Sequence, residues 1–193
     1  MQAQQRKLLM HMLETPRLIL RPPSDSDELL VHGLHSDPFV VNAVIGFYPT
    51  IEQSKAELLQ FINHWQRNGF GLWMVFVKDG GQARKFAGYC GLRCTGPRLP
   101  EDPNNIELVT RLHLAASEQG IAVEAGRAVI NFAFWHLKLQ RVTAFILPTN
   151  TRSRLKNLKI GFRYVGRRIY NNINMMYFLV TPDTFVETDD LLV

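Results

Sequence analysis

The segment from residue 106 to residue 137 constrains the fold more than any other part of the sequence. Apolar and polar residues alternate over 106–114, which is the pattern of a strand with one polar face. After Gly120, apolar side chains surround nearly the whole of the following helix, so this helix must be mostly buried. The chain of 193 residues is long enough for one domain with a sizeable core.

Strand and helix patterns interleave along the rest of the chain. Thr50 and Gln53 form a capping box before residues with helical spacing, and Gly69 is suited to end that helix. Turn residues at 79–81 predict a hairpin, and Pro22 after the first strand places that strand at a sheet edge. We expect strands near 17–21, 72–77, 86–92, 106–114, 142–147, 164–170 and 175–180, and helices near 24–31, 51–68, 121–137 and 153–159. The order predicts an α/β fold with a mixed sheet.

Composition excludes several classes of protein. Hydrophobic residues make up 46% of the chain and charged residues 20%, which excludes a disordered or coiled-coil protein. No apolar run reaches the ~18 residues of a membrane-spanning helix, and no signal-cleavage site follows the basic N-terminus, so we expect a cytoplasmic protein without membrane contact. The expected organisation is an N-terminal extension at 1–12, a single domain at 13–185 and an acidic tail at 186–193.

The cysteines and tryptophans are expected to serve the core. Cys90 and Cys94 are expected to be buried free thiols, because no nearby Cys/His cluster completes a metal site. The same location is expected for the three tryptophans, Trp65, Trp73 and Trp135.

Positive charge is concentrated in the C-terminal half. Residues 1–124 are nearly neutral, whereas residues 125–182 contain no Asp or Glu. Ten basic residues lie in the second stretch: Arg127, Lys138, Arg141, Arg152, Arg154, Lys156, Lys159, Arg163, Arg167 and Arg168. This distribution favours contact with an anion, with a nucleotide cofactor, RNA and bulk counter-ions as the alternatives.

The turn Ser117-Glu-Gln-Gly120-Ile-Ala122 before the buried helix is a candidate anion site. The first N–H groups of a helix lack intrahelical partners and lie at its positive dipole end, so a helix start can bind phosphate. Gly120 would let the backbone come close to such a ligand. The turn is neither a P-loop nor a dinucleotide fingerprint, since GxxxxGK[ST] and GxGxxG are absent. The alternative is an ordinary glycine-containing turn.

Ser117-x-x-Gly120-x-Ala122 resembles the acetyl-CoA loop of the GNAT N-acetyltransferase superfamily, and further motifs are similar to its RimJ/RimL-type branch. They run in family order over nearly the whole chain: Leu13-Glu-Thr-Pro-Arg-Leu-Ile-Leu-Arg-Pro22, Gly69-Phe-Gly-Leu-Trp73, Phe86-x-Gly88-x-x-Gly91-Leu92, Glu107, Ile121-Ala-Val-Glu-Ala125, and Asn150-x-x-Ser153 with Gly161-Phe162 and Gly166. The resemblance implies the GNAT fold, a mixed, mostly antiparallel central sheet of about seven strands, flanked by helices and splayed between strands four and five.

The resemblance also implies acetyl-CoA as cosubstrate and no metal. Pantetheine would bind the backbone near residues 112–114, and the pyrophosphate would lie on the amides of residues 119–123. The residues so implied in cofactor binding are Leu112, His113, Leu114, Ser117, Gln119, Gly120, Ile121, Ala122, Val123 and Asn150. Five basic residues could attract the 3′-phosphate of CoA or an acidic acceptor, or could form a solvated face: Arg152, Arg154, Lys156, Lys159 and Arg163. Ser117 and Glu118 depart from the family pattern, which would weaken binding if Glu118 faced the pyrophosphate.

Two residues are candidate catalytic groups. The resemblance implies direct attack of the acceptor amine on the thioester, without an acyl-enzyme. Glu107 is the candidate base, acting through a water, and the alternative is a rim carboxylate paired with Arg111. Ser153 is the candidate proton donor to the leaving CoA thiolate, although Asn150 and Ser153 would also be ordinary capping residues.

The predicted activity is acetyl transfer to a primary amine. An α-amino group of pKa ~8 is partly neutral at pH 7, whereas a lysine amine near ~10.4 demands more of a base, so we expect a protein or peptide N-terminus, such as that of a ribosomal protein. A small-molecule amine, either an antibiotic or a polyamine, is the alternative acceptor. Two other classes stay open: a non-catalytic acyl-CoA-binding regulatory module, and RNA binding, which no RNA-binding motif supports. We expect a monomer or a homodimer.

Overall fold

The computed structural model describes residues 11–42, 46–78, 84–117 and 119–185. An eight-stranded sheet runs through these residues in the order β1-β2-β3-β4-β5-β6-β8-β7. Its strands are β1 (Leu13–Glu14), β2 (Leu18–Arg21), β3 (Leu72–Lys78), β4 (Arg84–Cys94), β5 (Ile106–Leu112), β6 (Val142–Ile146), β7 (Arg163–Tyr170) and β8 (Ile173–Val180). The strand beyond the expected seven is β1, which pairs with β2, so the expectation of β2 at the sheet edge is wrong.

Neighbouring strands are antiparallel except β5 and β6, which are parallel. These two strands pair only where Glu107 lies opposite Thr143. The sheet is therefore mixed and mostly antiparallel, as predicted, and it splays between the expected fourth and fifth strands. β5 ends at Leu112, two residues earlier than expected, because the chain turns there into the short helix α5 (Leu114–Ser117).

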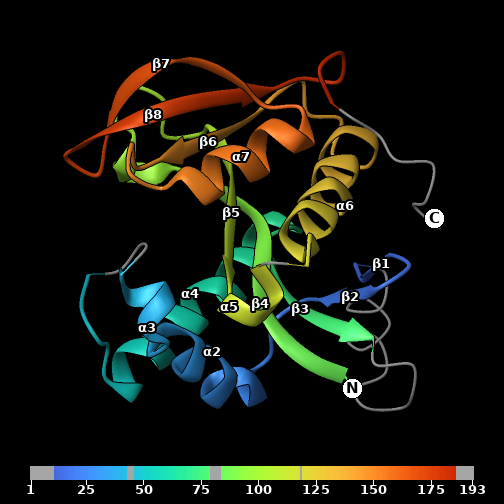
Figure 1. The fold of residues 1–193 in the computed structure, drawn as a ribbon, viewed down its shortest axis with the longest axis vertical. Coiled ribbons are helices and arrows are strands. Elements are labelled where there is room, and N and C mark those ends of the chain that lie inside the picture. The colour runs from blue at the N-terminus through green and yellow to red at the C-terminus, as the bar shows by residue number, and fades with distance from the viewer. Residues whose placement is uncertain (1–10, 43–45, 79–83, 118, 186–193) are drawn as a thin grey trace.

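Two groups of helices flank the sheet (Figure 1). One group comprises α2 (Glu28–His35), α3 (Pro38–Val40) and α4 (Ile51–Asn68), which pack on β3 and β4 through a small apolar cluster. The other comprises α6 (Ile121–Trp135) and α7 (Thr151–Ile160). The predicted capping box starts α4: Gln53 N–H donates to Thr50 Oγ1 at 3.3 Å, and Thr50 N–H donates to Gln53 Oε1 at 2.8 Å.

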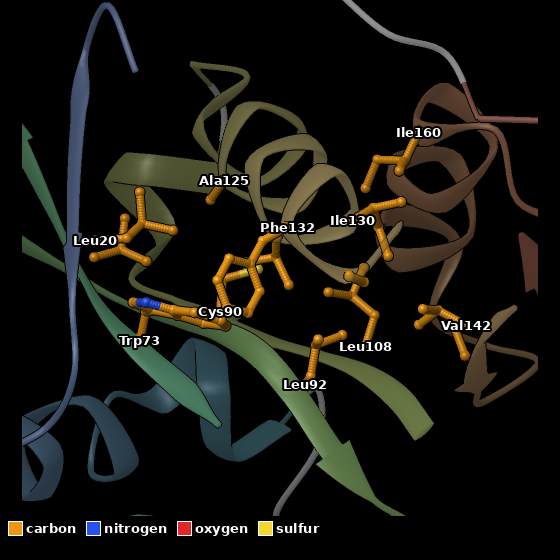
Figure 2. Packing of buried hydrophobic residues seen from close by; sticks show 14 of the residues in the cluster. Leu20, Trp73, Cys90, Leu92, Leu108, Ala125, Ile130, Phe132, Val142 and Ile160 are labelled. Atoms are coloured by element: carbon orange, nitrogen blue, oxygen red, sulfur yellow. The ribbon is translucent and has the colours of Figure 1, made fainter. Parts of the chain in front are cut away.

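The main core lies between α6 and the sheet (Figure 2). Trp73 and Cys90 are fully buried below α6, in agreement with the apolar pattern of that helix. A Cβ atom at Gly126 would collide with Ile160, so this glycine allows α7 to pack closely on α6. Trp135 is 51% exposed at the last residue of α6, so its expected core position is wrong. Both cysteines are free, with Cys94 only partly buried.

Several expectations lie outside the described residues. They concern the turn at 79–81, the side chain of Glu118, the acidic tail at 186–193 and all but the end of the extension at 1–12. Within the described part of the chain, no helix combines the length and apolar character needed to cross a membrane.

Candidate active site

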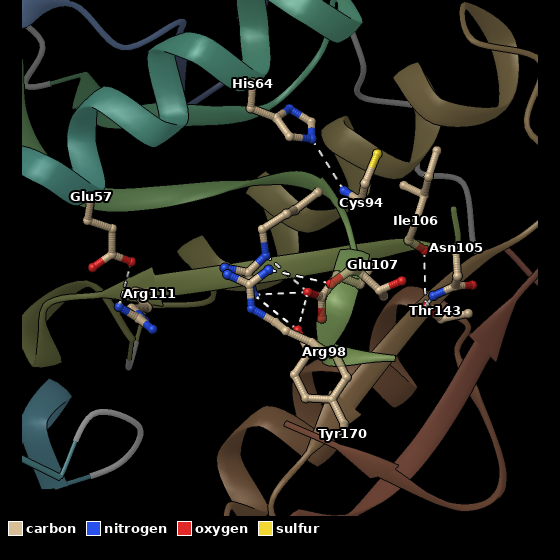
Figure 3. A network of polar contacts seen from close by, with 12 residues as sticks. Glu57, His64, Cys94, Arg98, Asn105, Ile106, Glu107, Arg111, Thr143 and Tyr170 are labelled. Atoms are coloured by element: carbon tan, nitrogen blue, oxygen red, sulfur yellow. Dashed lines mark hydrogen bonds and ion pairs between the residues drawn. The ribbon is translucent and has the colours of Figure 1, made fainter. Parts of the chain in front are cut away.

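The single paired position between β5 and β6 is held by side-chain hydrogen bonds. Asn105 Nδ2 donates to Thr143 Oγ1 at 2.6 Å, and Thr143 Oγ1 donates to Ile106 O at 3.1 Å (Figure 3). Asn105 and Thr143 are both buried. We call this point, defined by Asn105, Ile106, Glu107 and Thr143, the junction. Beyond it the two strands separate, so the junction fixes where the splay begins.

Glu107 is enclosed at the junction by two donors from distant parts of the chain. Arg93 Nε donates to Glu107 Oε1 at 3.0 Å, the NH2 nitrogen of Arg93 forms an ion pair with the same oxygen at 2.9 Å, and Tyr170 OH also donates to this oxygen. Burial, together with the Glu107 carboxylate, raises the pKa of Tyr170, so its hydroxyl keeps its proton. The expected partner Arg111 instead forms an ion pair with Glu57 at 3.5 Å, and the interpretation of Glu107 as a rim carboxylate is wrong because Glu107 is 4% exposed.

A first cavity of about 480 Å³ opens where β5 and β6 diverge. Its lining comes from α3, β5, the start of α6, and α7 with the residue before it: Phe39, Val40, Thr110, Arg111, Leu112, Gly120, Ala122, Val123, Asn150, Arg152, Ser153, Leu155, Lys156 and Lys159. Four of these residues are basic, and among the described lining residues none is acidic. The cavity therefore has the charge to hold an anion.

Backbone groups of β5 also face the first cavity. His113 N–H donates to Ala87 O on β4 at 2.9 Å, so the predicted His113 contact would not use this amide. Because backbone groups of a strand alternate between its two sides, those of Leu112 and Thr110 point away from β4, toward the splay. An extended ligand with amide groups could pair with them there.

The helix start expected to bind phosphate has the expected form. Gly120 adopts the left-handed conformation, with φ of +77°, and α6 begins at the next residue. The first intrahelical bond runs from Val123 N–H to Gly120 O, so the N–H groups of Ile121 and Ala122 have no intrahelical partner. Ser117 lies in α5.

Arg17, for which the sequence predicts no role, lies beside this helix start. Arg17 NH1 donates to Gln119 O at 2.9 Å, and its NH2 nitrogen lies 2.5 Å from Glu124 Oε2. A Cβ on Gly120 would lie 3.7 Å from Arg17 NH2. The guanidinium group thus lies beside the helix start, where the Glu124 carboxylate pairs with its charge and holds it in place. Arg17 belongs to the motif around β2, but nothing in that motif predicts a contact with the start of α6.

The two residues predicted at the start of α7 both line the first cavity. Asn150 Oδ1 accepts a hydrogen bond from Ser153 N–H at 3.0 Å, which is a capping interaction. Asn150 thus caps the start of α7, and the N–H of Ser153 is the group that it caps. The catalytic role of Ser153 and the cofactor role of Asn150 stay predictions. The predicted residues Leu112, Gly120, Ala122 and Val123 line the same cavity, whereas Leu114 and Gln119 are exposed outside its described lining.

A second cavity of about 620 Å³ lies beside α4 and β4. Glu57 lines it and forms the ion pair with Arg111, which lines the first cavity, so this pair connects the linings of the two cavities. Burial lowers the pKa of His35, another lining residue, to about 4, so its ring is neutral at pH 7. The charged residues lining the second cavity are Glu57, Arg67, Arg93 and Arg98.

Known proteins resemble this chain in sequence and in structure. YkkB of Bacillus subtilis (strain 168), an uncharacterized protein, is 29% identical over 157 residues, which cover 79% of this chain and 85% of YkkB. The aminoglycoside acetyltransferase AAC(6')-Ib, solved in complex with coenzyme A, is 16% identical with a TM-score of 0.73 over 86% of this chain and 96% of its own. A candidate ribosomal-protein-serine acetyltransferase from Vibrio cholerae is 18% identical with a TM-score of 0.66 over 89% of this chain and 97% of its own.

The two solved structures share the fold of this chain. A family model, the acetyltransferase (GNAT) domain, matches residues 17–163, which is more than half of the sequence. The expected superfamily is thereby confirmed, and the chain belongs to the GNAT acetyltransferase family.

Proposed function

We propose that this protein is an acetyl-CoA-dependent N-acetyltransferase of the RimJ/RimL type, with a protein or peptide N-terminus as acceptor. The observation that carries the proposal is the first cavity, which combines four basic side chains, free N–H groups at the start of α6 and unpaired backbone of β5. The basic side chains and the N–H groups fit the phosphates of CoA, and the β5 backbone fits its amide-bearing pantetheine arm. When bound, acetyl-CoA supplies an activated acyl carbon for attack by an amine.

The residues of the site position the reactants rather than form a covalent intermediate. Arg17 and the amides of Ile121 and Ala122 would hold the pyrophosphate, and the backbone of Leu112 would align the pantetheine arm. Holding two reactants in one geometry can contribute roughly 7–11 kcal/mol to lowering a barrier. Glu107 remains our candidate base: its two hydrogen bonds and its ion pair with Arg93 all involve Oε1, and Oε2 is left to receive a proton through a water.

The acceptor would enter through the second cavity, on the other side of the Glu57–Arg111 pair. A polyamine or an aminoglycoside carries several positive charges and would need a lining rich in carboxylates. Here Glu57 faces Arg67 and Arg98, while Arg93 is neutralised by Glu107. This balance suits an acceptor with a single amine, which supports a peptide N-terminus over the small-molecule alternative. The cytoplasmic location and the monomeric or homodimeric state stay predictions.

Calorimetric titration with acetyl-CoA tests the cofactor half of the proposal, with desulfo-CoA and ATP as controls. Micromolar binding of both CoA compounds and weak binding of ATP are expected. Absence of acetyl-CoA binding would overturn the proposal, and binding without turnover on any amine would favour a non-catalytic acyl-CoA-binding module.

Release of the CoA thiol, measured over a panel of amines, tests the acceptor half. Peptides with free N-termini should be acetylated, whereas the same peptides with blocked N-termini and an internal lysine should not. Glu57→Gln should raise the KM for the peptide without changing acetyl-CoA affinity. Glu52→Gln, an exposed carboxylate on the same helix, is the matched control. Preference for an aminoglycoside or a polyamine would instead assign the small-molecule class.

A further inference from the structure

Lys156 lines the first cavity from α7, a helix that leaves two of its leucines exposed. Leu155 and Leu158 are 51% and 47% exposed, whereas Lys156 is partly buried and lines the first cavity. An amphipathic helix normally buries its leucines and exposes its lysines. Although α7 buries Ile160, it also turns the Lys156 side chain toward the cavity, which brings an ammonium group into the site.

The surroundings of Lys156 leave its charge uncompensated. Its Nζ donates to Thr110 Oγ1 on β5 at 3.1 Å, and Thr110 Oγ1 lies 3.3 Å from Cys90 Sγ on β4. Within the described residues, no carboxylate lies at ion-pair distance from Lys156. The other charged residues that line the cavity are also cations: Arg111, Arg152 and Lys159. A buried cation without a counter-ion is unfavourable, so the site is suited to receive a negative charge.

The position of Lys156 along the cavity distinguishes it from the phosphate-binding groups. The start of α6, with Gly120, follows the end of β5, whereas Thr110 lies within the strand, nearer the junction. Lys156 thus faces the inner part of the cavity, away from the helix start. A ligand with its phosphates at Gly120 would extend its other end toward Lys156.

We propose that Lys156 is a catalytic residue whose ammonium group stabilises the departing thiolate of CoA. This inference rests on the proposed acetyltransferase function. As the amine nitrogen bonds to the acyl carbon, the carbon–sulfur bond breaks and its electron pair passes to sulfur. Lys156 pairs with that sulfur and transfers a proton to it, giving the free CoA thiol. The attacking amine loses its proton to Glu107 through a water, and exchange with solvent then returns a proton to Lys156 and removes one from Glu107.

The proton affinities of the two groups are matched. Burial lowers the pKa of Lys156 to about 8, while a thiol titrates near ~8.5 in water. Proton transfer between groups of similar pKa requires little driving force, which is the condition for efficient acid catalysis. Ser153, one turn earlier on α7, offers a neutral hydroxyl and lacks the charge that stabilises a thiolate. The charged ammonium is thus the stronger of the two candidates.

The test measures the ionisation of bound CoA directly, by the ultraviolet absorbance of its thiolate as a function of pH, with desulfo-CoA as the blank. In the wild-type complex, the thiolate fraction at pH 7 should exceed that of free CoA by about tenfold. Lys156→Met should abolish this excess, and Lys156→Arg should retain it because the charge is kept. Lys138→Met removes an exposed lysine and should behave like wild type.

Kinetics give a second readout. Lys156→Met should lower kcat for peptide acetylation by about a hundredfold or more, with little change in desulfo-CoA affinity. Equal thiolate fractions and equal kcat in wild type and Lys156→Met, with CoA bound to both, would overturn this inference alone. Failure of the wild-type protein to bind CoA would instead overturn the proposed function. Thermal unfolding of each variant verifies that the comparison is made between folded proteins.

Discussion

Two ionisable side chains near β5, Glu107 and Lys156, have opposite surroundings. At the junction, Glu107 receives hydrogen bonds from both Arg93 and Tyr170, and its charge is neutralised within the protein. In the first cavity, Lys156 donates a hydrogen bond to the neutral Thr110 and, within the described residues, has no carboxylate at ion-pair distance. A saturated ionic cluster is typical of a structural element, whereas an uncompensated charge in a cavity is typical of a functional site. We therefore expect the contacts of Arg93 and Tyr170 with Glu107 Oε1 to stabilise the junction, in addition to the role proposed for Glu107 as base, and we expect Lys156 to take part in the chemistry of the cavity.

The largest expected effect is the loss of the cation at the junction. Arg93→Met leaves Glu107 buried without its counter-ion, which should reduce the free energy of unfolding by about 3–5 kcal/mol. Urea unfolding at pH 7 measures the change. Arg141→Met is the matched control, because the ion pair of Arg141 with Asp102 is exposed and should contribute no more than about 1 kcal/mol. Similar losses in the two variants would remove the distinction between the junction and the surface.

A smaller loss is expected from the hydrogen bonds that hold β5 to β6. Thr143→Val removes the hydroxyl and leaves Asn105 Nδ2 and Ile106 O without this partner, which should lower the unfolding free energy by about 1–3 kcal/mol. Thr149→Val, at an exposed position, serves as control. If Thr143→Val proved neutral in urea unfolding, these bonds would not be what holds the junction.

Lys156→Met, in contrast, should raise the free energy of unfolding. Since burial lowers the pKa of Lys156 from 10.5 to about 8, the unfolded chain binds the proton more tightly than the folded one. The wild-type protein is therefore penalised below pH 8 and regains stability as the pH rises from about 8 toward 10.5. At pH 7 the substitution should stabilise the protein by roughly 1–2 kcal/mol, allowing for remaining solvent contact.

Thermal unfolding from pH 7 to pH 10 measures this window for Lys156→Met. The advantage of the variant should shrink across it, whereas the control Lys138→Met should match wild type throughout. A destabilised Lys156→Met at pH 7 would make Lys156 a structural residue, like Arg93, and would erase the contrast.

The smallest effect is expected at the start of α6. Arg17 is 49% exposed and is held by Glu124, so its charge is screened by solvent. Arg17→Met should weaken CoA binding by about two- to fivefold, in line with the roughly 0.3–1 kcal/mol of an exposed charge at a helix end. Calorimetry at low and at moderate salt measures the change, which should diminish at higher salt. An unchanged affinity would confine phosphate binding to backbone amides and the basic residues of α7.

Local patterns carried most of the fold. The capping box at Thr50, the left-handed glycine before α6 and the apolar surround of that helix are determined by residues close together in sequence, and each has the expected geometry. The predicted strand 106–114 is two residues too long, because the alternation of apolar and polar residues continues where the chain already turns at His113 into α5.

The partners within the site could not be predicted in the same way. Glu107 is bonded to residues 14 and 63 positions away, and spacing along a strand does not reveal either contact. The sequence does not distinguish Lys156 from the other basic residues between 152 and 163, because only the packing of α7 decides which of these side chains face inward. Long-range register and helix rotation are properties of the whole fold, so a single sequence leaves them open.

The separation of β5 from β6 also creates two strand edges in the interior of a sheet. Unpaired strand edges usually occur only at the margins, where they invite another chain to add on. Here α6 and α7 flank the gap together with Phe39 and Val40 of α3, so a narrow chain with amide groups can enter while a full strand is obstructed. If CoA binds as proposed, its pantetheine arm would complete the interrupted sheet, and the flanking helices would keep the two inner edges from pairing with a strand of another chain.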